Sequence, residues 1–404
     1  MATTTNAISR ISMSGDSHAW YLYDRYALEE NVREMNIAYR EHYGNFRIAY
    51  SYKTNYLADI VRTVKRSGCM AEVVSPYELK YAQAQGNAPD NIVYNGVIPD
   101  VEGKFLIAVE GGIVNVDNYE EYLALSEKAR ERDTRIAIGV RVNIDIGNGV
   151  SSRFGVDADS ETFEKMMLMI AEDRYVDFGG FHCHIGTSRP VKYWVRKIEQ
   201  MILLAKAYGA KYIDLGGGMF GPMSEDLSAQ FSEYTGSYEI YGREVGSRMK
   251  DAYPDESVLL IVEPGTALVG NTFSVMAHIT SIKDVRGQKY ITVDCSSNHI
   301  GFLCDAKDIP FTIYRTGVNE RQSVENAVIC GNTCLEYDYI RKNVNADHIA
   351  IGDTIVFENT GAYSISACRQ FIVPKIGVID FGTGEVLQRP ETAREMFSSF
   401  TAVD

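Results

Sequence analysis

The sequence lacks an excess of positive charge. Its 404 residues include 54 acidic and 40 basic side chains, which gives a formal net charge of −14 at pH 7. Nucleic acids and anionic membrane surfaces attract clusters of lysine and arginine. We therefore expect neither of them as a partner of this protein.

Long apolar runs and a cysteine framework are missing as well. No run approaches the about 18 apolar residues that a membrane-spanning helix needs, and residues 1–16 lack the apolar segment of a secretory signal. The cysteines number seven and are widely scattered, which does not fit a disulfide framework. Cys330 and Cys334 are not accompanied by a second pair at zinc-finger spacing, so we expect no metal site. We expect a cytoplasmic protein with reduced thiols.

Short apolar runs recur between residues 45 and 265. The eight runs cover residues 47–52, 70–74, 91–95, 112–117, 136–143, 178–186, 212–218 and 259–265. The segments between them, such as 58–68 and 195–209, repeat apolar residues at the steps typical of helices. Eight alternations of strand and helix predict a (β/α)8 barrel. An open doubly wound sheet is the alternative, but its G-x-G-x-x-G motif is absent.

The pattern changes after Gly270. Residues 272–294, 327–331, 354–359 and 370–380 are rich in β-formers and show few helical signals, which predicts a mostly antiparallel β domain. Residues 18–24 also resemble a strand. We therefore expect a barrel over residues 30–270 and a discontinuous β domain formed by residues 1–29 and 271–404.

The predicted barrel strands end in reactive side chains. Lys53 follows the first run, His182 and His184 end the sixth, and Glu263 ends the eighth. Three consecutive glycines follow the seventh run, where backbone N–H groups can approach a phosphate. Since strand ends meet at one rim of a barrel, this set suits a Schiff base between Lys53 and pyridoxal phosphate. The plain alternative is a Lys53 ammonium that reaches solvent or pairs with a neighbouring acid.

Seven motifs in order resemble the fold-type III, pyridoxal-phosphate-dependent decarboxylases, the group of diaminopimelate, ornithine and arginine decarboxylases. The motifs are YSYKTN (50–55), EVVSPYEL (72–79), FHCHIGTS (181–188), LGGGMFG (215–221), EPGTALVG (263–270), CGNTCLEYD (330–338) and GAYSIS (361–366). The resemblance covers nearly the whole chain. It implies an alanine-racemase-like barrel with a β domain, which agrees with the pattern of elements.

The resemblance also implies roles for single residues. Lys53 would carry the cofactor, His184 would stack on its ring, and Glu263 would pair with its pyridine nitrogen, whereas His182 is expected only to pack. The remaining residues expected at the cofactor are Glu72, Arg141, Thr187, Gly216, Gly217, Gly218, Gly265 and Tyr363.

Two further features follow from the resemblance. The active site would lie across a homodimer interface, and the partner chain would deliver Cys334, the acid that protonates the product carbon. Racemases of the same fold place an arginine where this chain has Glu263, so the glutamate favours a decarboxylase. A racemase or epimerase, or a protein that binds pyridoxal phosphate without catalysis, are the alternatives.

This chain departs from the family at positions that would face the substrate. Thr266 replaces the arginine of the family's E-P-G-R motif, Leu335 replaces an acid after the cysteine, and residues 294–305 lack an arginine. Together with Asp338, Thr266 and Leu335 are the candidate substrate-binding residues. Without these charges, the tail of diaminopimelate would be left unpaired. We expect an amino acid with a modified side chain. A carboxynorspermidine-type or carrier-bound substrate also stays open.

Overall fold

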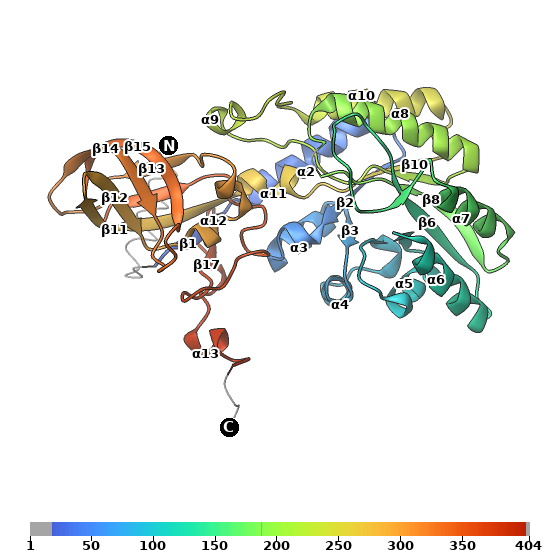
Figure 1. Ribbon diagram of the computed structural model, residues 1–404, viewed down its shortest axis with the longest axis horizontal. Coiled ribbons are helices and arrows are strands. Elements are labelled where there is room, and N and C mark those ends of the chain that lie inside the picture. The colour runs from blue at the N-terminus through green and yellow to red at the C-terminus, as the bar shows by residue number, and fades with distance from the viewer. Residues whose placement is uncertain (1–17, 187, 401–404) are drawn as a thin grey trace.

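The computed structural model describes residues 18–186 and 188–400, and it has two lobes, each built on its own sheet (Figure 1). One lobe is a barrel surrounded by helices, and the other is almost entirely β. The chain enters the barrel from the β lobe after residue 24 and returns to the β lobe after residue 272. The two lobes therefore meet at the segments that carry the strand ends.

Eight parallel strands of the described chain form a closed ring. They are β2 (Phe46–Ser51), β3 (Met70–Val73), β4 (Ile92–Tyr94), β5 (Ile113–Val116), β6 (Ile136–Asn143), β8 (Val176–His182), β9 (Tyr212–Asp214) and β10 (Leu259–Val262). Pairing of β5 with β6 closes the ring, while the two-residue β7 (Val156–Asp157) only adds to β6. Each of the eight predicted runs forms one of these strands. The predicted barrel is confirmed, and the open doubly wound sheet is wrong.

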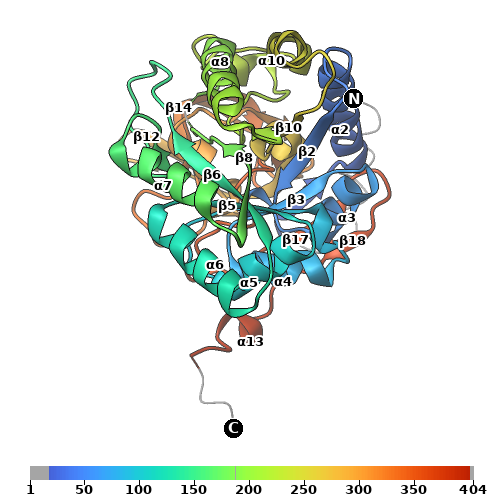
Figure 2. The same cartoon turned by 90° about the vertical axis from the view of Figure 1, so that its right-hand side faces the viewer.

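Helices surround the strands on the outside of the barrel (Figure 2). The longer ones are α2 (Arg25–Arg40), α3 (Ala58–Arg66), α4 (Pro76–Ala84), α5 (Val101–Val109), α6 (Tyr119–Glu131), α7 (Glu161–Glu172), α8 (Val191–Tyr208) and α10 (Tyr238–Ala252), with the short α9 (Glu225–Ser228) before α10. Their apolar faces have helical spacing: α8 buries Trp194, Ile198, Met201 and Ala205. These buried faces fix the helices on the barrel and thereby fix the strand ends.

The second sheet contains nine strands of the described residues. They are β1 (Trp20–Tyr23), β11 (Phe273–Val285), β12 (Gln288–Val293), β13 (Phe311–Tyr314), β14 (Gln322–Cys330), β15 (Tyr339–Ile349), β16 (Thr354–Phe357), β17 (Gly377–Asp380) and β18 (Val386–Gln388). Its pairings are antiparallel except for β1 with β17 and β12 with β14. The short helix α12 (Ser297–Ile300) lies between β12 and β13, and the short helix α13 (Ala393–Met396) follows β18.

The strand at residues 20–23 joins this second sheet, between β11 and β17. The next element, α2, packs against α10 of the barrel. The predicted boundary after residue 29 falls inside this helix. We therefore propose that the barrel unit begins at Arg25, where α2 starts.

A loop of the β lobe is bonded to the loop that carries Lys53. The backbone N–H of Tyr363 donates to the Thr54 carbonyl at 2.9 Å, and the Asn55 amide donates to the Gly361 carbonyl at 2.9 Å. The short helix α11 (Thr266–Val269) and a 3-10 turn at Gly270–Thr272 connect β10 with β11. No helix in the described part of the chain is long and apolar enough to span a membrane.

Candidate active site

A cavity of about 160 Å³ lies at the carboxyl ends of the barrel strands. Eight of the predicted site residues line it: Lys53, His184, Gly217, Gly218, Glu263, Gly265, Thr266 and Tyr363. Two more, Glu72 and Gly216, lie directly behind this lining and contact Lys53 and His184 respectively. The structure thus brings most of the predicted site together at one rim.

Lys53 lies in a 3-10 turn immediately after β2 and points to a buried carboxylate on the next strand. Its Nζ is 2.6 Å from Glu72 Oε2, which also accepts a hydrogen bond from Ser51 Oγ at 2.6 Å. Burial disfavours the charged amine, but the Glu72 and Glu263 carboxylates outweigh it and raise the pKa of Lys53. The amine must lose a proton before it can attack a carbonyl, and Glu72 is placed to accept that proton.

Glu263 is held by a chain of buried amides that runs through the barrel. Tyr212 Oη donates to Asn115 Oδ1 at 2.7 Å, and the Asn115 amide donates to Asn95 Oδ1 at 2.8 Å. The Asn95 amide then donates to Glu263 Oε1 at 2.5 Å and to Glu72 Oε1 at 3.2 Å. Asn95 therefore fixes both carboxylates relative to each other, so the two acids of the site share one rigid support.

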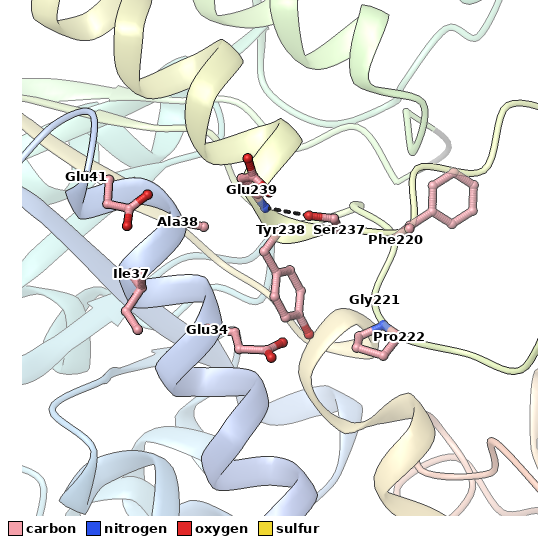
Figure 3. Close-up of a pocket in the computed structure, with 11 residues that line it drawn as sticks. Glu34, Ile37, Ala38, Glu41, Phe220, Gly221, Pro222, Ser237, Tyr238 and Glu239 are labelled. Carbon is pink, nitrogen blue, oxygen red and sulfur yellow. Dashed lines mark hydrogen bonds between the residues drawn. The ribbon is translucent and has the colours of Figure 1, made fainter.

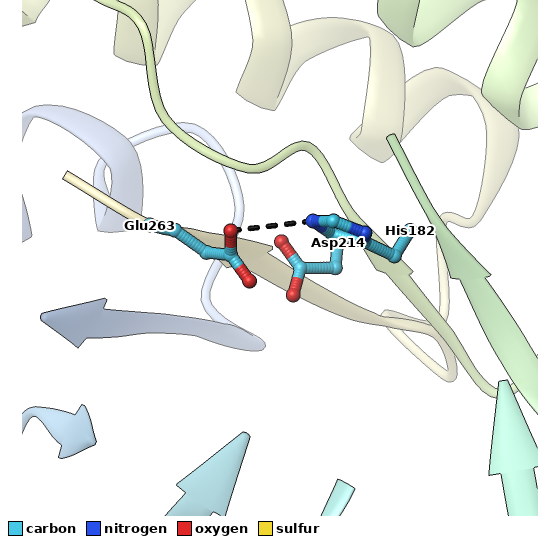
Figure 4. A group of neighbouring side chains, drawn as sticks. All are labelled: His182, Asp214 and Glu263. Carbon is cyan, nitrogen blue, oxygen red and sulfur yellow. Dashed lines mark hydrogen bonds and ion pairs between the residues drawn. The ribbon is translucent and has the colours of Figure 1, made fainter. Parts of the chain in front are cut away.

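Three titratable groups, Glu263, His182 and Asp214, lie close together (Figure 4). His182 Nε2 lies 3.2 Å from Glu263 Oε2, and the Asp214 carboxylate lies within 4.8 Å of both side chains. Burial and the nearby Glu263 charge raise the pKa of Asp214 well above its usual value. Burial opposes ionisation of Glu263 too, but His182 and Lys53 outweigh it and lower the pKa of Glu263. The pair therefore carries one negative charge, on Glu263.

His184 is oriented by the glycine loop that follows β9. The Gly217 N–H donates to His184 Nδ1 at 2.9 Å, so the ring proton belongs on Nε2. Burial and the nearby Lys53 lower the pKa of His184 well below its usual value, which keeps the ring neutral. A flat, neutral imidazole beside Lys53 suits stacking on an aromatic cofactor.

The loop tolerates only glycine where it touches the site. A Cβ on Gly217 would lie 2.4 Å from the Glu263 carbonyl oxygen, and one on Gly216 would lie 2.6 Å from His184 Cβ. Gly216 and Gly218 also have φ values of 61° and 87°, which favour glycine. Gly217 and Gly218 therefore border the cavity with no side chain in between, which lets a phosphate approach the backbone closely.

Tyr363 reaches the cavity from the β lobe. Its φ of 59° lies in the left-handed region, which non-glycine residues seldom adopt. The hydrogen bond to the Thr54 carbonyl and a stack on Phe302, with ring centroids 5.8 Å apart, hold it there. The constrained backbone therefore aims the phenol at the same cavity as the glycine loop.

Arg141 and Thr187 are the predicted cofactor residues that remain. Arg141 lies behind His184, where its guanidinium contacts the His184 carbonyl at 3.4 Å and Asp117 at 3.5 Å. This position supports the loop that carries His184. Thr187 lies outside the described residues.

The cysteine loop lies away from this cavity. Cys334, Leu335 and Asp338 border a different cavity, of about 440 Å³, on the β lobe. The Asp338 carboxylate is buried and accepts from the Ser297 N–H at 2.7 Å and the Thr333 hydroxyl at 2.5 Å. Asp338 therefore shapes the loop, while Cys334 and the 42% exposed Leu335 project from it.

A further cavity, of about 470 Å³, lies outside the barrel between α2 and α10 (Figure 3). Glu34, Glu41 and Glu239 border it, but none of the predicted site residues that the structure describes do. It contributes nothing to the chemistry at Lys53.

Several residues of the site could not be predicted from the sequence. Asp214 stands in the seventh apolar run, just before the glycines, but its partner Glu263 is far along the chain. His182 is predicted only to pack, yet it bonds Glu263. Ser51 lies within the motif at residues 50–55 and Arg189 directly follows the motif at 181–188, but neither position by itself indicates a place at the site. Asp214 is a polar residue inside an apolar strand, and this is the one sequence signal that could have indicated a site residue among them.

Three features of this structure fit pyridoxal phosphate: an amine at the end of the first barrel strand, a buried carboxylate opposite it, and a side-chain-free glycine loop. Residues 29–270 match the family described as "Pyridoxal-dependent decarboxylase, pyridoxal binding domain". That match covers more than half of the chain, and the cofactor follows from it.

Relatives and solved structures agree with this match. The chain is 26% identical to a diaminopimelate decarboxylase of Methanocaldococcus jannaschii over 345 residues, 81% of this chain and 76% of the relative. It is 26% identical to one of Aquifex aeolicus over 360 residues, 84% of this chain and 81% of the relative. A solved diaminopimelate decarboxylase from M. jannaschii superposes with a TM-score of 0.82 at 23% identity, over 95% of this chain and 92% of the other. This chain therefore belongs to the family of pyridoxal-phosphate-dependent decarboxylases.

Proposed function

We propose that this enzyme removes the α-carboxylate of an amino acid whose side chain differs from the diaminopimelate tail. One observation carries the proposal: Lys53 and Glu263 converge on a cavity that the glycine loop borders. The relatives are named as decarboxylases of diaminopimelate and of lysine and ornithine. The side chains of these amino acids end in charged groups. In this chain, Thr266 brings no charge to the cavity, and Leu335 presents an apolar side chain after the cysteine.

Bound pyridoxal phosphate supplies an electron-withdrawing ring that accepts the electron pair left behind when CO2 departs. Lys53 would hold the cofactor through its amine, and Glu72 would accept and return a proton at Lys53 Nζ. Glu263, ionised and buried, would keep a proton on the pyridine nitrogen. His184 would cover one face of the ring, and the glycine loop with Tyr363 would hold the phosphate.

A homodimer completes the site in this proposal. Cys334 is exposed and lies away from Lys53 within one chain, and the apolar side chains Leu335 and Tyr337 next to it are 42% and 80% exposed. Such a loop is suited to entering the cavity of a second copy, where Cys334 would deliver a proton to the α-carbon. A buried Asp338 keeps the loop in shape for this role.

Complementation between inactive chains tests the shared site. Lys53→Ala and Cys334→Ala chains are co-expressed with different tags and the mixed dimer is isolated. If the partner supplies Cys334, each mixed dimer has one intact site of two and about half the wild-type activity. A mixed dimer as inactive as its parents would show that each chain uses its own cysteine.

A CO2-release screen tests the reaction and the substrate class. Meso-diaminopimelate, lysine, ornithine, arginine and carboxynorspermidine are compared with amino acids carrying acylated or alkylated tails, free and carrier-bound. We expect the fastest release from a modified amino acid, and rapid turnover of diaminopimelate would contradict the proposal. The same incubations in heavy water identify a racemase, because a racemase exchanges the α-hydrogen and retains the carboxylate.

A further inference from the structure

A larger cavity, of about 840 Å³, adjoins the catalytic one. Gly186, Arg189, Thr266 and Tyr363 border both cavities. From this shared rim the larger cavity extends between the barrel loops and residues 302–307 of the β lobe. We call it the side chamber. A molecule that is held at Lys53 and is too long for the small cavity can extend into the side chamber.

The walls of the side chamber are largely apolar and aromatic. The rings and aliphatic side chains that border it are Tyr193, Phe220, Met223, Leu227, Phe231, Phe302 and Leu303. Its one acidic residue in the described chain, Glu233, is exposed and is paired with Lys192 at 2.6 Å. The chamber therefore offers no free carboxylate to a cationic group.

Two cations meet at one ring of this chamber. The Arg189 guanidinium lies 5.5 Å from the centre of the Phe231 ring and 5.8 Å from that of Phe220. The Lys307 ammonium lies 4.5 Å from the Phe231 ring. Arg189 comes from the loop after β8 and Lys307 from the β lobe, so the two lobes place one cation each at Phe231.

Neither cation has a carboxylate partner among residues 18–186 and 188–400. The Lys307 ammonium donates one hydrogen bond, to the Gln230 carbonyl at 2.6 Å, so two of its three N–H donors can still bind a ligand. The Arg189 guanidinium is half-buried, with the rings of Phe220 and Phe231 as its described contacts. Half-buried cations without a carboxylate are costly unless an anion joins them. The arrangement is that of an anion site lined by apolar rings.

We propose that the side chamber binds the side chain of the substrate and that this side chain ends in a carboxylate held by Arg189 and Lys307. The inference rests on the proposed function and names its substrate class: an amino acid with an apolar stem and an anionic end. The cofactor phosphate is a less suitable occupant. Lys307 borders only the side chamber, while the glycine loop borders the small cavity.

Three amino acids of similar stem test the charge preference: L-2-aminopimelate with a terminal carboxylate, L-lysine with an ammonium, and L-norleucine with neither. The dissociation constant of each is measured from the absorbance change of the holoenzyme. A charge-assisted hydrogen bond predicts that L-2-aminopimelate binds about 10- to 100-fold more tightly than L-lysine. Equal binding of all three, or a preference for L-lysine, overturns the proposal.

Variants assign the preference to the two cations. Arg189→Gln and Lys307→Gln should each weaken L-2-aminopimelate binding by about 10-fold and leave L-norleucine binding unchanged. Lys192→Gln removes a lysine that is paired with Glu233 at the edge of the side chamber, so this variant is the matched control and should keep the preference. If Lys192→Gln loses it as well, or neither chamber variant loses it, the assignment is wrong.

Titrations with pyridoxal phosphate and pyridoxal show whether Arg189 binds the substrate side chain or the cofactor phosphate. Each variant should bind both compounds like the wild type, which also shows that its site is folded. Arg189→Gln could instead bind pyridoxal phosphate more weakly, bind pyridoxal normally and still prefer L-2-aminopimelate to L-lysine. That result would assign Arg189 to the cofactor phosphate and overturn this inference. A wild-type protein that binds neither compound overturns the proposed function itself.

Discussion

Two neighbouring buried carboxyl groups should respond in opposite ways to amide substitution. Asp214 and Glu263 lie within 4.8 Å of each other and of His182, and both are less than 5% exposed. The raised pKa of Asp214 and the lowered pKa of Glu263 place the single negative charge on Glu263. Glu263→Gln therefore removes a charge, whereas Asp214→Asn replaces one neutral group by another.

The structure sets the size of each effect. Glu263 is hydrogen-bonded on both oxygens, to Asn95 and His182, and removing one partner of such a buried charged pair costs about 2–5 kcal/mol. If the cost falls on the transition state, the turnover rate drops about 30- to 5,000-fold. Asp214→Asn retains an oxygen that can accept from the Gly216 N–H, so its cost should stay below about 1 kcal/mol, or about 5-fold.

The assay compares single-turnover CO2 release by the two variants with the best substrate of the screen, together with their dissociation constants for pyridoxal phosphate. Asp214→Asn should resemble the wild type in both measurements. Glu263→Gln should release CO2 far more slowly. If Asp214→Asn loses as much activity as Glu263→Gln while retaining its fold, the charge has been placed on the wrong carboxylate and the reasoning fails.

Two further substitutions test the support of the site. Gly217→Ala places a Cβ 2.4 Å from the Glu263 carbonyl oxygen and should weaken pyridoxal phosphate binding by about 10-fold or more. Gly186→Ala, whose Cβ would have its nearest contact at 3.7 Å, should weaken this binding less. Equal affinities of the two variants would contradict the loop geometry. Burial lowers the pKa of Lys197 to about 8, so the contribution of this residue to stability should rise by about 3 kcal/mol between pH 8 and 10.5, since there only the unfolded lysine holds its proton. In urea unfolding, the stability of the wild type relative to Lys197→Met should therefore rise by this amount; a difference that does not change with pH would refute it.

The barrel was predictable because its signals are local. Each barrel strand is a short apolar run closed by polar or glycine residues, and each intervening helix has apolar residues at helical spacing. The order of these runs determines a parallel barrel, and the end of each run determines which side chains reach the rim. Lys53, His184 and Glu263 are predictable in this way, from their places at the ends of three runs.

What the sequence did not reveal depends on contacts between distant segments. The opposite charge states of Asp214 and Glu263 arise from a pairing across 49 positions, and the link from Asn95 to both Glu72 and Glu263 joins three strands. Arg189 follows a recognised motif, yet its position at the side chamber depends on Phe231 and on the β lobe. Such arrangements form when the barrel closes, and they produce no periodic pattern in the sequence.

Borohydride reduction of the holoenzyme, followed by peptide mass spectrometry, tests most directly whether the amine at the end of β2 anchors the cofactor. We expect a single stable pyridoxyl adduct on Lys53, and no adduct on that peptide in Lys53→Ala, although the variant keeps the fold. Buried Lys104 and Lys197 serve as internal controls and should stay unmodified. An adduct on a lysine other than Lys53, or none on a protein saturated with pyridoxal phosphate, would contradict the account.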